Sequence, residues 1–209
     1  MAAALDQGIL KCISTDTMRA VMRSYIGDEV SPALHRSSYA AAFEGDDPVR
    51  SWMETCTCLS TSVEDIVQDA IDRQVSLVLE GVHIVPSKKL IDKWKDSGGV
   101  AIGVLLKIDE PEKHKAQLQR RGFTTGQMSN ENKKIKSYDR IRAIQAEMIR
   151  LADKNDWIQI EQNGDIDPLE AMTRALERNE MDYSSYDKNT FAGSIRAHYK
   201  LRQLRYEKV

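Results

Sequence analysis

The sequence lacks the features of a membrane protein and of a secreted, disulfide-stapled protein. No apolar run approaches the roughly 20 residues that a membrane-spanning helix needs. Residues 1–6 carry neither the basic start nor the long apolar core of a secretory signal. Cysteine is scarce: Cys12, Cys56 and Cys58 make an odd number in a chain of 209 residues, which is long enough to fold without disulfides. We therefore predict reduced thiols, a cytoplasmic location and no membrane partner.

The sequence also lacks an excess of charge of either sign. It has 30 Lys and Arg against 32 Asp and Glu, a formal net charge of -2, so the total gives no support to nucleic-acid binding. The one basic run, residues 133–136, has none of the interleaved aromatic side chains on which bases stack. Cys56 and Cys58 have no second Cys/His pair at zinc spacing. We predict neither a nucleic-acid partner nor a structural zinc site, and the oligomeric state stays open.

The most informative stretch that is present runs from Val75 to Pro86. Its apolar residues show no alternation, which is typical of a strand buried on both faces in a parallel sheet. The strand leads into Glu80, Gly81 and His83. Because open α/β sheets bind ligands beyond the carboxyl ends of their strands, a carboxylate at this point is a candidate for holding Mg²⁺ or its water beside a phosphate. A carboxylate that only caps a loop is the alternative.

Strand-like and helix-like segments alternate along the chain. Strands are expected at 9–13, 76–82, 100–108 and 157–160, with amphipathic helices between them. This order predicts an α/β fold, a parallel sheet with helices on both faces. We assign residues 1–180 to one domain and 181–209 to a basic C-terminal helix or flexible tail, with partner binding as the alternative role.

Residues 25–58 are the least periodic part of this domain. Glycines and prolines break the segment into short pieces, and we expect one of these, 34–43, to be helical. Thr61 and Glu64 have the spacing of a capping box, which predicts that the next helix begins at Thr61. The segment reads as an insertion over the sheet.

Acidic and basic side chains follow the predicted strands. Asp16 and Glu80 each come where a strand ends, so the two carboxylates should meet at one edge of the sheet. Two sets of cations accompany them: Arg19 and Arg23 on the helix after Asp16, and Arg121, Lys133, Lys136 and Arg142 later in the chain. Two carboxylates facing cations suit phosphoryl transfer, in which a protein mainly positions the reactants and neutralises phosphoryl charge. Each single cation can equally belong to a solvated helix face.

Several of these segments together resemble one known family. The segments are Ser14 to Arg19, Met22 to Ser24, Leu34 with Ser38 and Tyr39, Leu79 to His83, Glu112 to His114 with Arg121, and Asn132 to Gln145 with Lys133, Lys136 and Arg142. They are similar to the P-loop kinase domain of 2-phosphoglycerate kinase and of the related plant low-phytic-acid proteins. The similarity extends over roughly residues 3–175, and Ser-Thr-Asp-x-x-Arg and Glu-Gly-Val-His are its most specific parts.

The resemblance implies a five-stranded parallel sheet of the P-loop NTPase, nucleoside-monophosphate-kinase-like type. It implies ATP- and Mg²⁺-dependent phosphorylation of a small acceptor, a hydroxylated phosphate such as 2-phosphoglycerate or an inositol-phosphate-type polyol. Asp16 would lie by the acceptor and Glu80 by Mg²⁺, through water, as the catalytic pair. Substrate would contact Arg19, Arg23, Tyr39 and His83, although His83 can also be a packed loop residue. ATP phosphates would contact Arg121 in the lid, Lys133, Lys136 and Arg142.

One family element is missing from the sequence. The phosphate loop G-x-x-x-x-G-K-[ST] does not occur, because no glycine here is followed by lysine. The resemblance then implies that the chain starts just after this loop: either it is a truncated product or an incomplete gene model, or the remaining strands close up into one sheet. It would also lack the first strand, which such kinases place between the strands at 76–82 and 102–108. We expect impaired ATP binding; the alternative is a non-catalytic module that binds a phosphorylated ligand or has a regulatory role.

Overall fold

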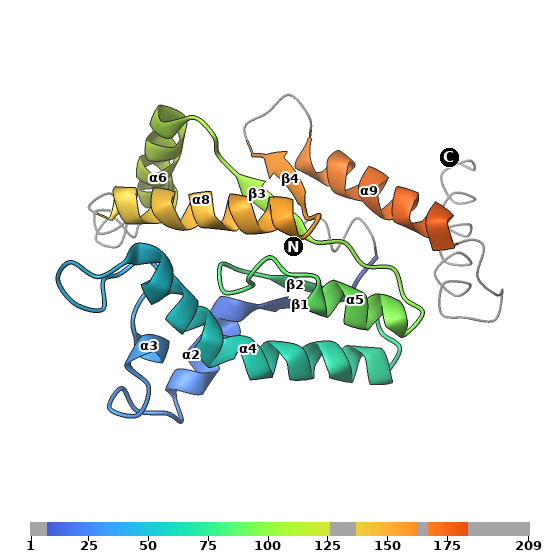
Figure 1. The fold of residues 1–209 in the computed structure, drawn as a ribbon, viewed down its shortest axis with the longest axis horizontal. Helices are drawn as coiled ribbons and strands as arrows, with labels where there is room; N and C mark the ends of the chain where they lie inside the picture. Colours follow the sequence, from blue (N-terminus) through green and yellow to red (C-terminus); the bar gives the residue numbers. More distant parts are fainter. Residues whose placement is uncertain (1–7, 126–136, 163–166, 184–209) are drawn as a thin grey trace.

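The fold combines small parallel sheets with helices, as a computed structural model shows (Figure 1). The structure describes residues 8–125, 137–162 and 167–183. Within these ranges, no helix is both long enough and apolar enough to cross a membrane. The parallel strand pairs and the helices between them confirm the α/β class predicted from the sequence. Of the predicted C-terminal segment 181–209, only residues 181–183, at the end of a helix, are described.

The first half of the chain contains one pair of strands. Strand β1 (Lys11–Ser14) leads into α2 (Thr15–Arg23), and the short α3 (Pro32–His35) and the long α4 (Pro48–Asp72) precede β2 (Leu77–Glu80). The two strands pair in parallel, with Lys11 opposite Leu77 and Ser14 opposite Glu80. Both strands therefore end at the same level of the sheet.

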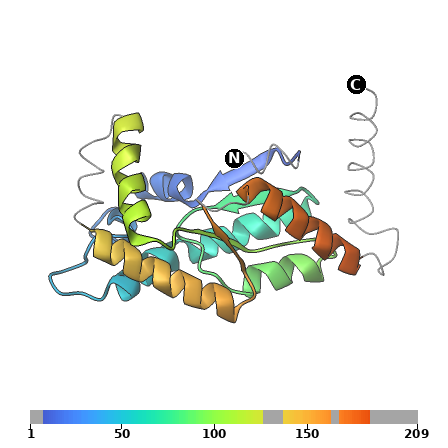
Figure 2. The same cartoon turned by 90° about the horizontal axis from the view of Figure 1, so that it is seen from above.

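The second half contains the other pair. After α5 (Lys89–Asp96) come β3 (Val104–Lys107), α6 (Pro111–Thr125), α8 (Tyr138–Lys154), β4 (Ile158–Glu161) and α9 (Pro168–Tyr183). Strands β3 and β4 are also parallel, with Val104 opposite Ile158 and Lys107 opposite Glu161. Figures 1 and 2 show β1 and β3 running toward the side of the molecule where α2 and α6 begin.

The remaining strands do not close up into one sheet within the described residues. They form two separate two-stranded sheets, β1–β2 and β3–β4. The break lies between β2 and β3, where the resemblance leads us to expect an absent strand. The strands are also less buried than predicted: β2 is half-buried with Glu80 exposed, and Leu106 in β3 is 47% exposed. A sheet of only two strands offers a narrow surface for helices to cover, so both of its faces are not buried as they are in a wide parallel sheet.

The four predicted strands and most predicted helices are confirmed, but the capping box and the helix at 34–43 are wrong. Helix α4 begins at Pro48, capped by the Asp47 carboxylate, which accepts a hydrogen bond from Arg50 N at 2.6 Å. Thr61 lies inside this helix. Proline at the first helical position and an aspartate before it are strong start signals, which outweigh the Thr-Glu pair. In the 34–43 segment only Pro32–His35 is helical.

Helix α4 forms the centre of the described core. One face packs Leu59 and Val63 against Met18 of α2 and Leu34 of α3. Another packs Trp52 and Cys56 against α8, which supplies Ile144, Met148 and Leu151. Trp52 and Leu59 are fully buried. A single long helix therefore joins the two halves of the molecule.

Within the insertion at residues 25–58, the loop between α3 and α4 is fixed to α8 by an ion pair. Arg140 donates to the Asp46 carboxylate at 2.6 and 3.2 Å, and to Tyr39 O at 3.1 Å. The Asp46 side chain is 3% exposed, and it also accepts from Ser51 Oγ and from Ala42 N. These hydrogen bonds, that of Ser51 foremost, lower the pKa of Asp46 to about 2. The insertion is thus anchored through a carboxylate that stays ionised.

Candidate functional site

The two predicted catalytic acids lie at the carboxyl ends of neighbouring strands. Ser14, the last residue of β1, is paired with Glu80, the last residue of β2. Ser14 also caps α2, its hydroxyl accepting from Asp16 N at 3.2 Å. Because the cap fixes the first turn of α2, the Asp16 side chain emerges directly above the strand end, where it is 72% exposed. Asp16 and Glu80 are both exposed carboxylates, available to a ligand at this edge.

His83 lies under Asp16 and is enclosed by protein. Its side chain is 0% exposed, and its Nδ1 is 3.6 Å from Asp16 Oδ1 and 3.2 Å from Thr15 Oγ1. Burial, partly offset by Asp16, lowers the pKa of His83. An enclosed ring cannot touch a ligand in the bulk solvent. Among the described residues, the charged group nearest to His83 Nδ1 is the Asp16 carboxylate, which lies between the buried ring and the solvent.

Gly81 brings the two strand ends together. Its φ of +133° lies in the region that favours glycine, and a Cβ on this residue would overlap Thr15 Oγ1. The following residue is held from below, since Trp52 Nε1 donates to Val82 O at 2.8 Å. The Glu-Gly-Val-His segment is therefore closely packed on the start of α2 and on α4.

The predicted substrate-binding residues of α2 and the insertion have different environments. Arg19 is 8% exposed and donates to Leu34 O at 2.7 Å and to Arg36 O, which anchors α3. Burial, followed by the nearby Arg23 cation, lowers the pKa of Arg19, although a guanidinium stays charged in proteins. Arg23, one turn later, is exposed at the end of α2. Tyr39 is partly buried against the cluster of Trp52 and Ile144.

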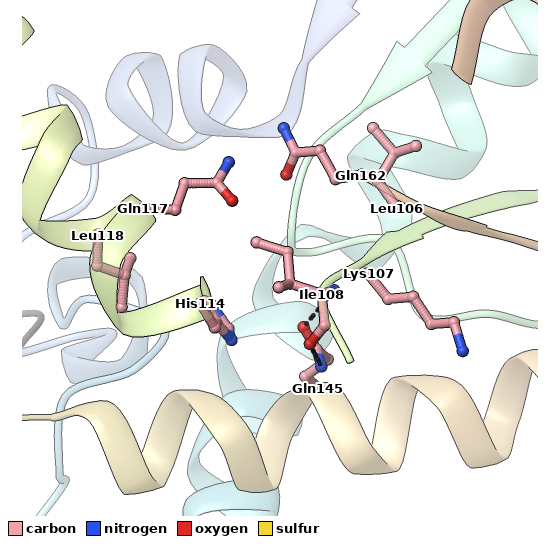
Figure 3. A pocket seen from close by; sticks show the side chains of 8 residues that line it. All are labelled: Leu106, Lys107, Ile108, His114, Gln117, Leu118, Gln145 and Gln162. Atoms are coloured by element: carbon pink, nitrogen blue, oxygen red, sulfur yellow. Dashed lines mark hydrogen bonds between the residues drawn. The ribbon is translucent and has the colours of Figure 1, made fainter. Parts of the chain in front are cut away.

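A cavity of about 110 Å³ lies at the ends of β3 and β4 (Figure 3). Ile108 and Leu118 give it apolar walls, and Figure 3 shows Gln117 of α6 and Gln162, beyond β4, on either side of the opening. The complete lining is Leu106, Lys107, Ile108, His114, Gln117, Leu118, Gln145 and Gln162. Amide groups around an apolar floor can hydrogen-bond the edge of a flat, polar ring.

The floor of this cavity is held in place by α8. Gln145 donates to Ile108 O at 2.9 Å and accepts from Ile108 N at 3.2 Å, satisfying both polar groups of that residue. Arg142, one of the predicted phosphate ligands, donates to Ile108 O at 2.6 Å and to Asp109 O at 3.1 Å, and its Nη1 is 3.5 Å from His114 Nδ1. Arg142 therefore lies beside the cavity, where part of its donor capacity is used by main-chain carbonyls.

Other predicted ligands lie outside what the structure describes. Lys133 and Lys136 fall between the described segments, and only the backbone of Arg121, within α6, is described. Conversely, sequence reasoning gave no role to Gln117 and Gln162. Uncharged amides on an amphipathic helix and after a strand carry no pattern of their own. The one available signal was position, since Gln162 comes two residues after the predicted strand at 157–160.

The described residues contain no group of three or more His, Cys, Asp and Glu side chains that could hold a metal ion. Asp16 and Glu80 are therefore at most a two-carboxylate donor set. Such a set suits Mg²⁺, which usually keeps several waters and takes one or two carboxylates together with substrate phosphates. It does not suit zinc, which prefers nitrogen and sulfur ligands.

Comparison of the sequence with known proteins identifies similar proteins. The chain is 30% identical over 155 residues to the 2-phosphoglycerate kinase of Methanopyrus kandleri, and 30% identical over 152 residues to that of Methanocaldococcus jannaschii. These matches cover 71% and 70% of the chain. The chain is similar to archaeal 2-phosphoglycerate kinases. This supports the kinase part of the resemblance stated above; it does not test the plant proteins or the missing loop.

The similarity to these kinases is partial in length. The chain spans about half of the same two relatives, 47% and 48%. An uncharacterised protein of Dictyostelium discoideum is 29% identical over 162 residues, which is 74% of the chain and 19% of that protein. No family model matches the chain, and no solved structure matches it.

Proposed function

We propose that this chain is a phosphotransferase domain of the 2-phosphoglycerate kinase type, which transfers a phosphoryl group from ATP to a small hydroxylated or phosphorylated acceptor. The observation that carries the proposal is the register of β1 and β2, which places Asp16 and Glu80 at the ends of paired strands. The sequence similarity to archaeal 2-phosphoglycerate kinases supports it independently.

Within this proposal the β1–β2 end binds the acceptor. The exposed Asp16 carboxylate accepts a hydrogen bond from the acceptor hydroxyl and orients it, as carboxylates do in phosphoryl transfer. Arg23, exposed on the same helix, pairs with the acceptor's own phosphate or carboxylate. Arg19 acts indirectly: it does not contact the acceptor but holds α3, and thereby the insertion that borders the acceptor.

The β3–β4 end binds the nucleotide. The cavity beside Arg142 has the size and the amide lining for part of a purine ring. Glu80 holds Mg²⁺ through water, and the ion when bound neutralises phosphate charge. We assign Arg121, Lys133 and Lys136 to the phosphates of ATP. Because no Gly-Lys pair is available to cradle these phosphates, we expect weak ATP binding and slow transfer by this chain.

The first test measures phosphate transfer from ATP to 2-phosphoglycerate and, separately, to inositol. We expect slow transfer by the unaltered chain, and a loss of about 10²-fold or more in Asp16→Asn, since a positioned carboxylate contributes that much to proton transfer. Asp65→Asn is the matched control, because Asp65 is exposed on α4 away from this edge. Equal rates in the two variants would remove Asp16 from the mechanism.

The absent Gly-Lys pair favours a second candidate, a non-catalytic module that binds a phosphorylated ligand. Calorimetry with 2-phosphoglycerate and with Mg-ATP separates the two. Binding of 2-phosphoglycerate without ATP binding or transfer supports the module. Binding of neither compound contradicts both candidates.

A further inference from the structure

The buried pair of Thr15 and His83 lies directly beneath the exposed carboxylate of Asp16. His83 Nδ1 faces two oxygens, Thr15 Oγ1 at 3.2 Å and Asp16 Oδ1 at 3.6 Å. Its other ring nitrogen, Nε2, is buried and has no hydrogen-bond partner within the described structure. We propose that His83 is a neutral positioning residue, whose Nδ1–H group is directed at the Asp16 carboxylate and fixes its orientation.

The geometry selects the tautomer. An ionised carboxylate only accepts hydrogen bonds, so Asp16 favours a proton on the nitrogen that faces it. A hydroxyl can accept as well as donate, so Thr15 suits the same arrangement. With the proton on Nδ1, Nε2 is left as a bare acceptor in the interior. The opposite tautomer would turn the Nδ1 lone pair toward a carboxylate and bury an unpaired N–H group as well.

The surroundings keep the ring neutral. Protonation would place a cation at a position with no exposed surface, and its new N–H group at Nε2 would have no partner. The charged neighbours are Asp16, which favours the cation, and Arg19, which opposes it. Cys56 of α4, which packs near this loop, remains a thiol because burial raises its pKa to about 12. No second carboxylate contacts the ring among the described residues.

The function of this contact follows from the exposure of Asp16. A carboxylate that is 72% exposed on the first turn of a helix is free to rotate unless one oxygen is held. In this proposal the Nδ1–H dipole, 3.6 Å from Oδ1, attracts that oxygen electrostatically, which leaves Oδ2 for the acceptor hydroxyl. This inference rests on the proposed role of Asp16. It adds that His83 acts through Asp16 and does not itself contact the substrate, and that Thr15 completes the contact.

The first experiment reads the tautomer in the unaltered chain, without any activity. Long-range ¹⁵N–¹H correlation spectra distinguish a protonated ring nitrogen from a bare one. We expect His83 to carry its proton on Nδ1 and to be neutral at pH 8, above its lowered pKa. His35 is an internal control of the opposite kind, because its Nε2 is 2.6 Å from Ile26 O and must donate to that carbonyl. A proton on Nε2 of His83, or an imidazolium, overturns the proposal.

The second experiment compares two amide substitutions. Asparagine can place an N–H group where Nδ1 lies, whereas glutamine reaches toward the position of Nε2. We expect His83→Asn to retain kcat within about threefold and His83→Gln to lose about 10²-fold, with little change in KM, because a misdirected group is that costly. Thr15→Ser and Thr15→Val form a corresponding pair at Thr15 Oγ1, because serine keeps the hydroxyl that faces His83 and valine removes it. Equal losses in both members of each pair would show that the residues act only through folding.

The outcomes separate this inference from the proposed function. Absence of phosphate transfer by the unaltered chain counts against the function, and the ¹⁵N spectra still decide whether His83 carries its proton on the nitrogen that faces Asp16. Transfer that persists in His83→Gln at the unaltered rate supports the function and contradicts the positioning role.

Discussion

The ends of the two strand pairs differ in what their polar side chains bind. At the β1–β2 end, the buried Thr15, Arg19 and His83 contact one another, Asp16 or main-chain carbonyls, and the exposed side chains are Asp16, Glu80 and Arg23. At the β3–β4 end, amide side chains such as Gln117 and Gln162 surround a cavity of about 110 Å³. The two ends share one architecture, a parallel pair followed by helices.

This difference separates two ways of making a site. At the β1–β2 end most buried polar groups other than His83 Nε2 already have protein partners, so the exposed side chains they contact are largely fixed before any ligand arrives. At the β3–β4 end Gln145 is also held, by Ile108, but the amides surround a cavity that a ligand can enter. Helix α4 packs on α2 and α3 on one side and on α8 on the other, so damage to it should affect both ends.

The largest effect is expected from Trp52→Ala. Trp52 is fully buried in the contact between α4 and α8 and donates to Val82 O at 2.8 Å. Removing a buried tryptophan costs about 3–5 kcal/mol of unfolding free energy. Trp52→Phe keeps most of the packing and loses mainly the hydrogen bond, about 1–2 kcal/mol plus a smaller packing term. Urea denaturation measures both. Similar losses in the two variants would show that the anchor of the Glu-Gly-Val-His segment is the hydrogen bond and not the packing.

The next largest effect is expected from Gly81→Ala. Alanine there is strained at φ +133°, and its Cβ overlaps Thr15 Oγ1, so we expect a loss of about 3 kcal/mol. Gly98→Ala is the matched control. Gly98 has φ +86° but nothing within 4 Å of a Cβ, so only strain of about 1 kcal/mol applies. Denaturation measures the difference. Equal losses in the two variants would mean that Gly81 is not packed against Thr15 as closely as the structure shows.

Sequence reasoning could place the β1–β2 end because its signals are local. An apolar run that ends in Glu-Gly, and a second that ends in Ser-Thr-Asp, predict two strand ends, and parallel pairing brings them together. It could not see that Arg19 and His83 are buried. That depends on α3, α4 and the insertion closing over them, which are contacts distant in sequence. The same periodicity that identifies a helix face does not tell which neighbour covers it.

The errors in the fold have a physical origin of the same kind. The strands were identified from their apolar content, but the number of sheets depends on which edges pair, and no local pattern records this. The 47% exposure of Leu106 is therefore visible only in the structure, whereas the break between β2 and β3 lies where the resemblance expects a strand to be absent. The amide-lined cavity escaped for a related reason, since its residues come from four separate segments.

A smaller and pH-dependent effect is expected from the Asp46–Arg140 ion pair, which ties the insertion to α8. The pKa of Asp46 falls from 3.8 to about 2 in the folded chain. A depressed carboxyl pKa stabilises the fold above pH 4, and this contribution is lost as the pH falls from about 4 to 2. We expect Asp46→Asn to be less stable at pH 6 and to lose less on acidification than the unaltered chain. Asp69 and Glu147 also have lowered pKa values, so part of the acid sensitivity should remain. Parallel pH curves would contradict this role.

At the β3–β4 end, single amide substitutions should change binding and leave the fold intact. If Gln117 and Gln162 hydrogen-bond a nucleotide base, then Gln117→Leu and Gln162→Leu should each weaken ATP binding by about five- to tenfold, the loss of one such bond. Gln119→Leu is the matched control, because Gln119 is exposed on the same helix as Gln117 and does not line the cavity. Calorimetry with Mg-ATP gives the dissociation constants. Equal weakening in all three variants would indicate a general effect on α6 and remove the cavity from the nucleotide site.

The smallest perturbation uses the cysteines to test whether the β1–β2 half is closed without a ligand. Cys56 is 3% exposed, and burial raises the pKa of its thiol to about 12, so almost no thiolate is present at pH 8. Cys12 and Cys58 are half-buried. Because the thiolate is the reactive form, iodoacetamide should modify Cys12 and Cys58 in the native chain well before Cys56. Mass spectrometry of peptides gives the three rates, and in urea they should converge. Rapid native modification of Cys56 would mean that α4 separates from Val82 readily, and the β1–β2 end would then be no more preorganised than the cavity.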